Sequence, residues 1–347
     1  MEINIINQYL KETLETYYES NEPGSQFKVS AKHIIHINED EFNILNKSKL
    51  IYSINVTRLR FAVLDIDSKK YLAIVGTNSL FIDNTDFLEV SINNVIFLSV
   101  TGAINLKIHE NVSTAYIRDV IYPIEEEEKN KTGYELNSIK DLFEPFIVLE
   151  IPSQEVQNEF QIKAHIAKIL LANSKYTYLD FAPDTIKSYI EYFNSCNYDD
   201  NIFNSILAYC WRYCFLDVYR CMEPLFRHIP LHGLKSEINF TGSIDDLYEK
   251  IYNHCGWRPQ ETSSMETLFT SNYLTEELLE KLRLMNIGES PDENVGKSIY
   301  RLRNKIVHHQ GVLSDIETSL TIENWNKLIS YLLDSLMELR KKILHET

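Results

Sequence analysis

Residues 201–222 read NIFNSILAYCWRYCFLDVYRCM, and they are the strongest guide to architecture in this chain of 347 residues. A helix drawn through them is apolar nearly all the way round, which is typical of a helix surrounded by other helices. The few charged side chains in such a helix need partners, because burying an unpaired charge is costly. Pro224 follows and should end or kink the helix. The stretch therefore predicts the central helix of a bundle.

The neighbouring sequence divides into two patterns. Beyond residue 150, apolar residues recur at helical spacing. We predict helices at 153–173, 183–195, 201–222, 243–254, 273–285, 293–308 and 321–344. A short amphipathic helix is also predicted over residues 3–18.

From about residue 27 to 122, by contrast, the segments are short, rich in β-branched and aromatic residues, and separated by Asn, Gly, Asp and Ser. A doubly wound parallel sheet needs crossover helices, and no convincing helix interrupts these segments. We therefore expect an α+β protein. Its N-terminal domain (1–150) is expected to be β-rich and to form an antiparallel sandwich or barrel. Its second domain (151–347) is expected to be all-α, with its core at about 200–345. The charged run EEEEKNKTG, residues 125–133, predicts a loop or linker.

Charge and cysteine content restrict the function. A net charge of −16 argues against broad coating of DNA, so contact with nucleic acid must be local. No apolar run is long enough to span a bilayer, and the N-terminus is acidic where a secretory signal is basic. Five cysteines favour a reducing compartment over a disulfide framework, and we expect a cytoplasmic protein without membrane contact. Cys210, Cys214 and Cys221 share one helical stripe, but no CxxC pair accompanies them, so packing is favoured over zinc.

One local exception to the acidity is the stretch SIYRLRNKIVHHQG, residues 298–311. It holds Arg301, Arg303 and Lys305 and directly follows Lys297, and no acid separates these four cations. On an ideal helix Ile299, Leu302 and Ile306 share the face that packs into the bundle. The opposite side carries Lys297, Arg301, Asn304, Lys305 and His308.

Within this stretch, RNKIVH (303–308) has the form Arg-Asn-x3-His. This resembles the signature of the HEPN superfamily, in which Arg is followed by four to six residues and then His, commonly with a polar residue directly after the Arg. Arg303, Asn304 and His308 match it position by position. Two other pairs have the same spacing, Arg227 with His232 and Arg340 with His345. Pro230 interrupts the first, and the second lies in the C-terminal tail.

The stretch DVYRCMEPLF (217–226) resembles the Tyr-Arg-x2-Glu segment of some HEPN proteins, especially the ApeA-like abortive-infection group. The likeness covers about residues 200–345 and does not extend to residues 1–150. It implies a helical bundle that acts on RNA as a metal-independent endoribonuclease, as a homodimer, in defence against phage. No cofactor or metal is implied. The N-terminal domain would sense a trigger ligand or protein, or recruit the substrate.

The two motif residues pose a geometric problem. On one straight helix Arg303 and His308 lie about 140° apart, so they cannot reach the same phosphate. Either the helix unwinds near His308, which Gly311 would permit, or two copies meet so that the Arg of one subunit faces the His of the other. The resemblance implies the second arrangement. It also brings two basic clusters to one cleft.

These residue types suit RNA cleavage. The 2′-hydroxyl is an internal nucleophile, so the reaction needs proton transfer and charge stabilisation. His308 is the expected acid or base, with His309 as an alternative, and Arg303 is expected to bind the phosphate. Asn304 would hold the imidazole or the phosphate, and Glu223 would fix Arg303 from a neighbouring helix. Lys297, Arg301 and Lys305 would bind RNA.

An alternative from another class is an inert HEPN scaffold for dimerisation, partner binding or nucleotide binding. In that case Arg303 forms a structural ion pair with a carboxylate. His308 then caps the last carbonyl groups of its helix.

Overall fold

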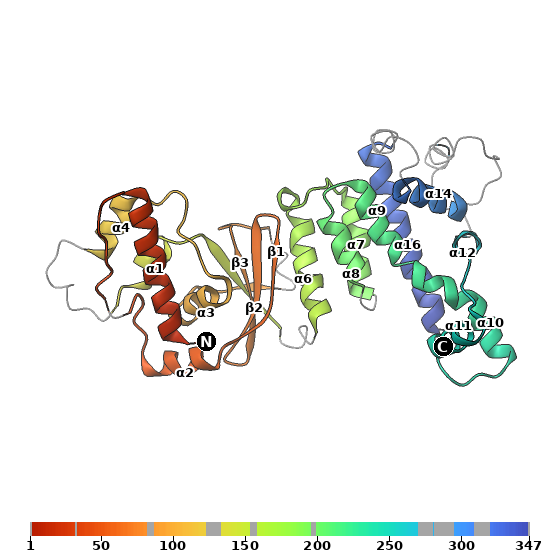
Figure 1. Cartoon of the computed structure of the whole chain (residues 1–347), viewed down its shortest axis with the longest axis horizontal. Coiled ribbons are helices and arrows are strands. Elements are labelled where there is room, and N and C mark those ends of the chain that lie inside the picture. Colours follow the sequence, from red (N-terminus) through yellow and green to blue (C-terminus); the bar gives the residue numbers. More distant parts are fainter. Residues whose placement is uncertain are drawn as a thin grey trace. The chain divides into compact units, whose positions relative to one another are not determined.

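The computed structural model describes residues 2–31, 33–81, 87–122, 133–152, 158–195, 199–269, 280, 295–308 and 320–345. The chain forms two compact units, Met1–Ile169 and Leu170–Thr347 (Figure 1). The division falls inside α6 (Glu159–Ala172), later than the boundary expected at residue 150. Of the expected linker at 125–133, all but Gly133 lies outside the described residues.

The first unit is built on an antiparallel sheet. Its strands are β1 (Lys49–Val56), β2 (Leu59–Ile66), β3 (Lys69–Val75), β4 (Leu88–Glu89) and β5 (Phe146–Ile151), in the order β1-β2-β3-β5-β4. Every pairing between them is antiparallel, as predicted. The described residues form one open sheet, however, so the prediction of a sandwich or barrel is wrong.

Helices in this unit were not expected between the strands. They are α2 (Glu39–Lys47), α3 (Asn94–Ile104), α4 (Thr114–Ile121) and α5 (Leu136–Lys140), in addition to the predicted α1 (Ile3–Asn21). Three of them start at a side-chain cap: Asn38, Asn93 and Ser113 each accept a hydrogen bond from a backbone N–H of the first turn. A short, mostly apolar run such as that of α3 cannot be assigned to strand or helix by periodicity alone. The caps were the signal that separates the two.

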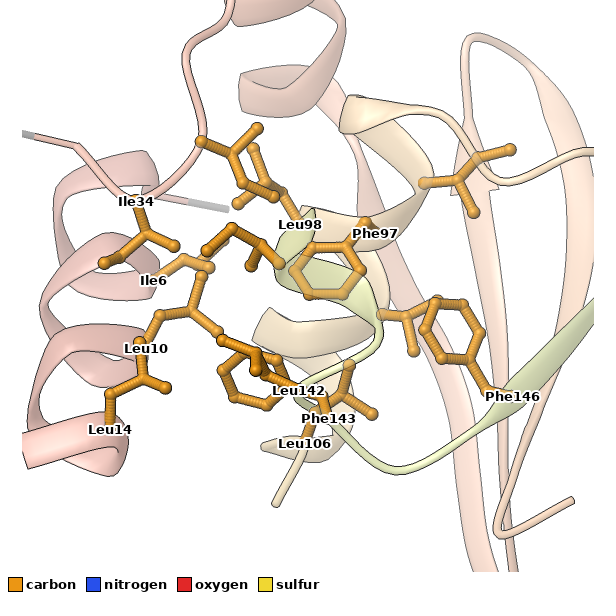
Figure 2. Close-up of a cluster of buried hydrophobic side chains, with 14 of the residues drawn as sticks. Ile6, Leu10, Leu14, Ile34, Phe97, Leu98, Leu106, Leu142, Phe143 and Phe146 are labelled. Atoms are coloured by element: carbon orange, nitrogen blue, oxygen red, sulfur yellow. The ribbon is translucent and has the colours of Figure 1, made fainter. Parts of the chain in front are cut away.

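The core of the first unit lies between these helices and one face of the sheet (Figure 2). Leu10 and Leu14 of α1 point toward Phe97 and Leu98 of α3, with Phe146 of β5 beside them. The ring centroids of Phe97 and Phe143 lie 5.9 Å apart with their planes tilted by 71°. The helices therefore cover the face of the sheet that carries Leu64, Ile66, Ala73 and Val75.

The described part of the second unit is helical. It contains α7 (Pro183–Ser195), α8 (Asp200–Leu207), α9 (Trp211–Arg220), α10 (His228–Glu237), α11 (Ile244–Cys255), α12 (Glu261–Leu268), α14 (Val295–Val307) and α16 (Ile322–His345). Two 3-10 turns, η3 (Ser174–Tyr176) and η4 (Glu223–Arg227), join them. The predicted helices at 183–195, 243–254, 293–308 and 321–344 are confirmed; that at 273–285 lies outside the described residues except for residue 280.

The predicted central helix 201–222 is two helices. Ala208 and Cys210 have extended backbone, and Tyr209 between them is exposed. The break lets α8 and α9 pack against each other, which buries apolar faces that one straight helix would direct elsewhere. Phe215 of α9 lies against Trp325 of α16, with 6.3 Å between ring centroids. α9 ends at Arg220, before Pro224, as expected.

Within the described ranges, no helix combines the length and the apolar character that a membrane span requires.

Candidate functional site

The motif residues lie on α14, which crosses α12 and also contacts α9 (Figure 1). Ile299, Leu302 and Ile306 are buried, which confirms the predicted packing face. α12 and α14 approach closely at Gly296, where a Cβ atom would lie 2.0 Å from the carbonyl oxygen of Met265. The absence of a side chain at this position lets α12 lie against the motif helix.

Arg303 is held by three neighbours. Its Nη1 donates a hydrogen bond of 2.9 Å to Oδ1 of Asn304, and its Nη2 lies 3.8 Å from Oε2 of Glu261 on α12. Its guanidinium carbon also stands 5.9 Å from the ring centroid of Tyr219 on α9. The side chain remains 20% exposed, so the guanidinium is fixed in place yet still open to solvent on one side.

The carboxylate beside Arg303 is not the one that the sequence suggested. Glu223 was expected to fix the guanidinium, but Glu261 occupies that place. The same groups nevertheless affect Glu223. Burial and the charge of Glu261 raise the pKa of its carboxyl group, whereas the charge of Arg303 lowers it. Sequence reasoning missed Glu261 because nothing in its own stretch, QETSSMETL, marks it as a site residue.

The aromatic ring of Tyr219 lies against the guanidinium of Arg303. It belongs to the Tyr-Arg-x2-Glu stretch quoted above, and its side chain is only 1% exposed. The pKa of its phenol is raised well above the ordinary value. Burial is the larger cause, and the charge of Glu261 is the second. Its hydroxyl group is buried and has no hydrogen-bond partner in the part of the chain that the structure describes.

We expect Tyr219→Phe to leave the free energy of unfolding unchanged or to raise it by about 1 kcal/mol, because it removes a buried hydroxyl that makes no hydrogen bond. Tyr189→Phe is the matched control. The hydroxyl of Tyr189 is equally buried but bonds to Oγ of Ser205 at 2.8 Å. Its loss should lower stability by about 1 kcal/mol or more. Urea unfolding of both variants measures the difference, and equal losses would contradict the description of Tyr219.

His308 is exposed and lies at the end of α14. Its N–H donates a hydrogen bond of 2.9 Å to the carbonyl oxygen of Asn304, as in a regular helix. Helical hydrogen bonding of the backbone therefore continues as far as His308. His309, the alternative imidazole, and Gly311 lie outside the described residues.

The basic cluster is less isolated than the sequence indicated. Nζ of Lys297 lies 4.0 Å from Oε1 of Glu266 on α12, and the charge of Glu266 also acts on Arg301. Partial burial lowers the pKa of both Arg301 and Lys305. With Arg303, α14 thus carries four cations, and the two carboxylates of α12 leave a local charge of about +2.

The sequence also raised two further Arg–His pairs, a stripe of cysteines and a possible metal site. Arg227 forms an ion pair of 3.0 Å with Asp245, and Arg340 one of 3.1 Å with Asp199, so both are engaged outside the motif. Cys214 and Cys221 are buried, and Cys210 is partly buried. Among the described residues, no group of three or more His, Cys, Asp or Glu side chains could hold a metal ion.

A comparison with protein-family models, curated proteins and solved structures finds no match to this chain.

Proposed function

We propose that this chain is a metal-independent endoribonuclease of the HEPN type that acts as a homodimer. The proposal rests on the way α14 and the residue that follows it present three side chains. One helix presents a fixed, partly exposed guanidinium at Arg303, an amide at Asn304 and an exposed imidazole at His308. RNA cleavage needs a cation that binds phosphate and a group that transfers protons, and a guanidinium and an imidazole are residue types suited to these two tasks.

The proposed reaction proceeds by attack of the 2′-oxygen on the adjacent phosphorus. A bond forms between O2′ and phosphorus while the bond from phosphorus to O5′ breaks. His308 moves the proton, either from the 2′-hydroxyl or to the departing 5′-oxygen. Arg303 donates hydrogen bonds to the non-bridging oxygens as their negative charge grows. The products are a 2′,3′-cyclic phosphate and a 5′-hydroxyl.

Homodimerisation is part of the proposal because of the helix geometry. Arg303 turns toward Tyr219 and Glu261, whereas His308 directly follows the last residue of α14 and is exposed. A two-fold pairing of α14 would set Arg303 of each subunit opposite His308 of the other. It would also place two clusters of net positive charge at one cleft, which suits a single polyanionic strand.

The test is incubation of the whole chain with total RNA and with a defined single-stranded RNA in EDTA. We expect cleavage products that carry 2′,3′-cyclic phosphate ends. Cleavage that requires a divalent ion, or that leaves 3′-hydroxyl ends, would refute the mechanism. Because a defence effector can be latent until triggered, growth arrest on expression in bacteria is the second assay. We expect Arg303→Ala and His308→Ala each to relieve it.

An inert scaffold is the second candidate, and one observation favours it. Arg303 already has a carboxylate and an amide as partners, as expected for a structural ion pair. A scaffold would produce no cleavage and no growth arrest, and its Arg303→Ala variant would differ from wild type only in stability or oligomeric state.

A further inference from the structure

A pocket of about 470 Å³ lies on α12, next to the residue that pairs with Arg303. Phe226 of η4, Pro230 of α10, Trp257 and Pro259 provide its apolar wall. The volume falls within the range of small-ligand sites, which are mostly apolar with a few polar groups that fix orientation. The pocket therefore has the size and the wall that a flat aromatic ligand requires.

The polar lining of this pocket contains one cation and no carboxylate. It consists of Arg258, Gln260, Ser263, Ser264 and Thr267. Arg258 is held in position, since its Nη2 donates a hydrogen bond of 2.7 Å to the hydroxyl of Tyr252 and its guanidinium lies 5.1 Å from that ring's centroid. In a chain with a net charge of −16, a pocket without acids is suited to an anionic ligand.

A second pocket, between α7 and α16, shows the opposite character. It is larger, at about 750 Å³, but five carboxylates and three lysines line it. Two of the three lysines lie close to carboxylates, Lys187 at 3.8 Å from Glu191 and Lys327 at 2.6 Å from Glu323. A polyanion would be repelled there, so of these two pockets the one on α12 is better suited to RNA.

The α12 pocket is also connected to the motif through the chain itself. Gln260, which lines the pocket, is directly followed by Glu261, whose carboxylate lies 3.8 Å from Nη2 of Arg303. Ser263 and Ser264 continue the pocket wall along the same helix. A strand bound at Arg303 thus has an aromatic, hydrogen-bonding pocket on the other side of α12.

We infer that this pocket binds one unpaired base of the RNA whose phosphate is held at Arg303, an inference that rests on the proposed function. The base stacks on Trp257, as bases of single strands do on aromatic side chains. Gln260 and the hydroxyl groups of Ser263, Ser264 and Thr267 face its polar edge, and Arg258 binds a neighbouring phosphate. The pocket would then set which nucleotide lies beside the cleaved bond.

The experiment measures binding apart from cleavage. The full chain carrying His308→Ala, which cannot cut, is titrated in EDTA into a labelled single-stranded oligoribonucleotide, and fluorescence anisotropy gives the Kd. Thr267→Trp fills the pocket from an exposed position of α12, and Asn253→Trp on α11 is the matched control. We expect Thr267→Trp to raise the Kd about tenfold and Asn253→Trp to leave it unchanged.

Trp257→Ala should weaken binding by a similar factor. Trp257 packs on Tyr248, with ring centroids 6.2 Å apart, so this variant can also lose stability, and Thr267→Trp keeps the test independent of folding. A duplex of the same sequence should bind more weakly than the single strand, because its bases are paired.

Two results would overturn the inference. Equal Kd values for Thr267→Trp and Asn253→Trp, or equal binding of duplex and single strand, would reject the base pocket while leaving the ribonuclease proposal intact. Absence of RNA binding together with absence of cleavage by wild type would reject the proposed function, and the base pocket with it.

Discussion

Arg303→Ala and His308→Ala should each lower the rate of RNA cleavage at least about a hundredfold. General acid–base catalysis typically contributes about 10² to 10⁴ in rate, and the loss of one donor to a developing oxyanion costs about 10² to 10³. Neither residue belongs to the buried face of α14 formed by Ile299, Leu302 and Ile306: His308 is exposed, and Arg303 is 20% exposed where it packs against Tyr219. The buried face of α14 should therefore be retained, and the measurement is the single-turnover rate on a defined RNA in EDTA.

Mixing the two inactive variants distinguishes a site shared between subunits from a site within one chain. If Arg303 of one subunit works with His308 of the other, a mixed dimer contains one intact site and one doubly damaged site. With random assortment half of the dimers are mixed, so about a quarter of the wild-type rate should return. A site contained within one chain predicts no recovery, which would rule out the dimeric arrangement.

Matched variants show whether the loss is specific to the site. Arg58→Ala and His254→Ala remove the same residue types from exposed positions that do not belong to α14 or to the elements that hold Arg303. We expect both to cleave RNA at the wild-type rate. A comparable fall in either control would mean that the rate responds to general damage and not to the removal of Arg303 or His308.

Sequence alone predicted the helical half well. The helix at 183–195 matches α7 residue for residue, and the packing face of Ile299, Leu302 and Ile306 is buried as expected. Amphipathic periodicity carries this information because only one stripe of each helix is apolar. Where the stripe disappears, as in residues 201–222, periodicity gave no sign of the break before Trp211.

The N-terminal half was predicted less accurately for the same reason. The run NVIFLSV, residues 94–100, is mostly apolar and suggests a strand, but it forms the greater part of α3. Asn93 one residue earlier is the local signal for a helix start, because its side chain accepts a hydrogen bond from the N–H of Ile96. The two-residue turn at Asp67 and Ser68, both with positive φ, shows by contrast how local residues specify a hairpin.

At the candidate site, a motif indicates which residues to examine but not what surrounds them. Arg303, Asn304 and His308 could be identified because they lie within six residues of each other. Glu261 could not, because it reaches Arg303 only through the crossing of α12 and α14. Contacts between distant segments depend on packing, and packing is not encoded in a local pattern.

Gly296→Ala should disturb that crossing and the site with it. The added Cβ would lie 2.0 Å from the carbonyl oxygen of Met265 and 2.5 Å from its carbon, and both are backbone atoms that cannot rotate away. The two helices must separate, which should lower the free energy of unfolding by about 2–3 kcal/mol. Separation also moves Glu261 away from Arg303, so the cleavage rate should fall as well.

Gly233→Ala is the control for the chemical change itself. Gly233 lies within α10, and no atom other than those of its own helix backbone and chain neighbours comes within 4 Å of a Cβ added there. Alanine favours a helix over glycine by up to about 1 kcal/mol, so this variant should keep its activity and unfold at the same or a higher urea concentration. If Gly296→Ala behaved like Gly233→Ala in both assays, close packing of α12 on α14 would not be what fixes the guanidinium of Arg303. The ion pair between Arg303 and Glu261 would then have to be maintained by the side chains alone.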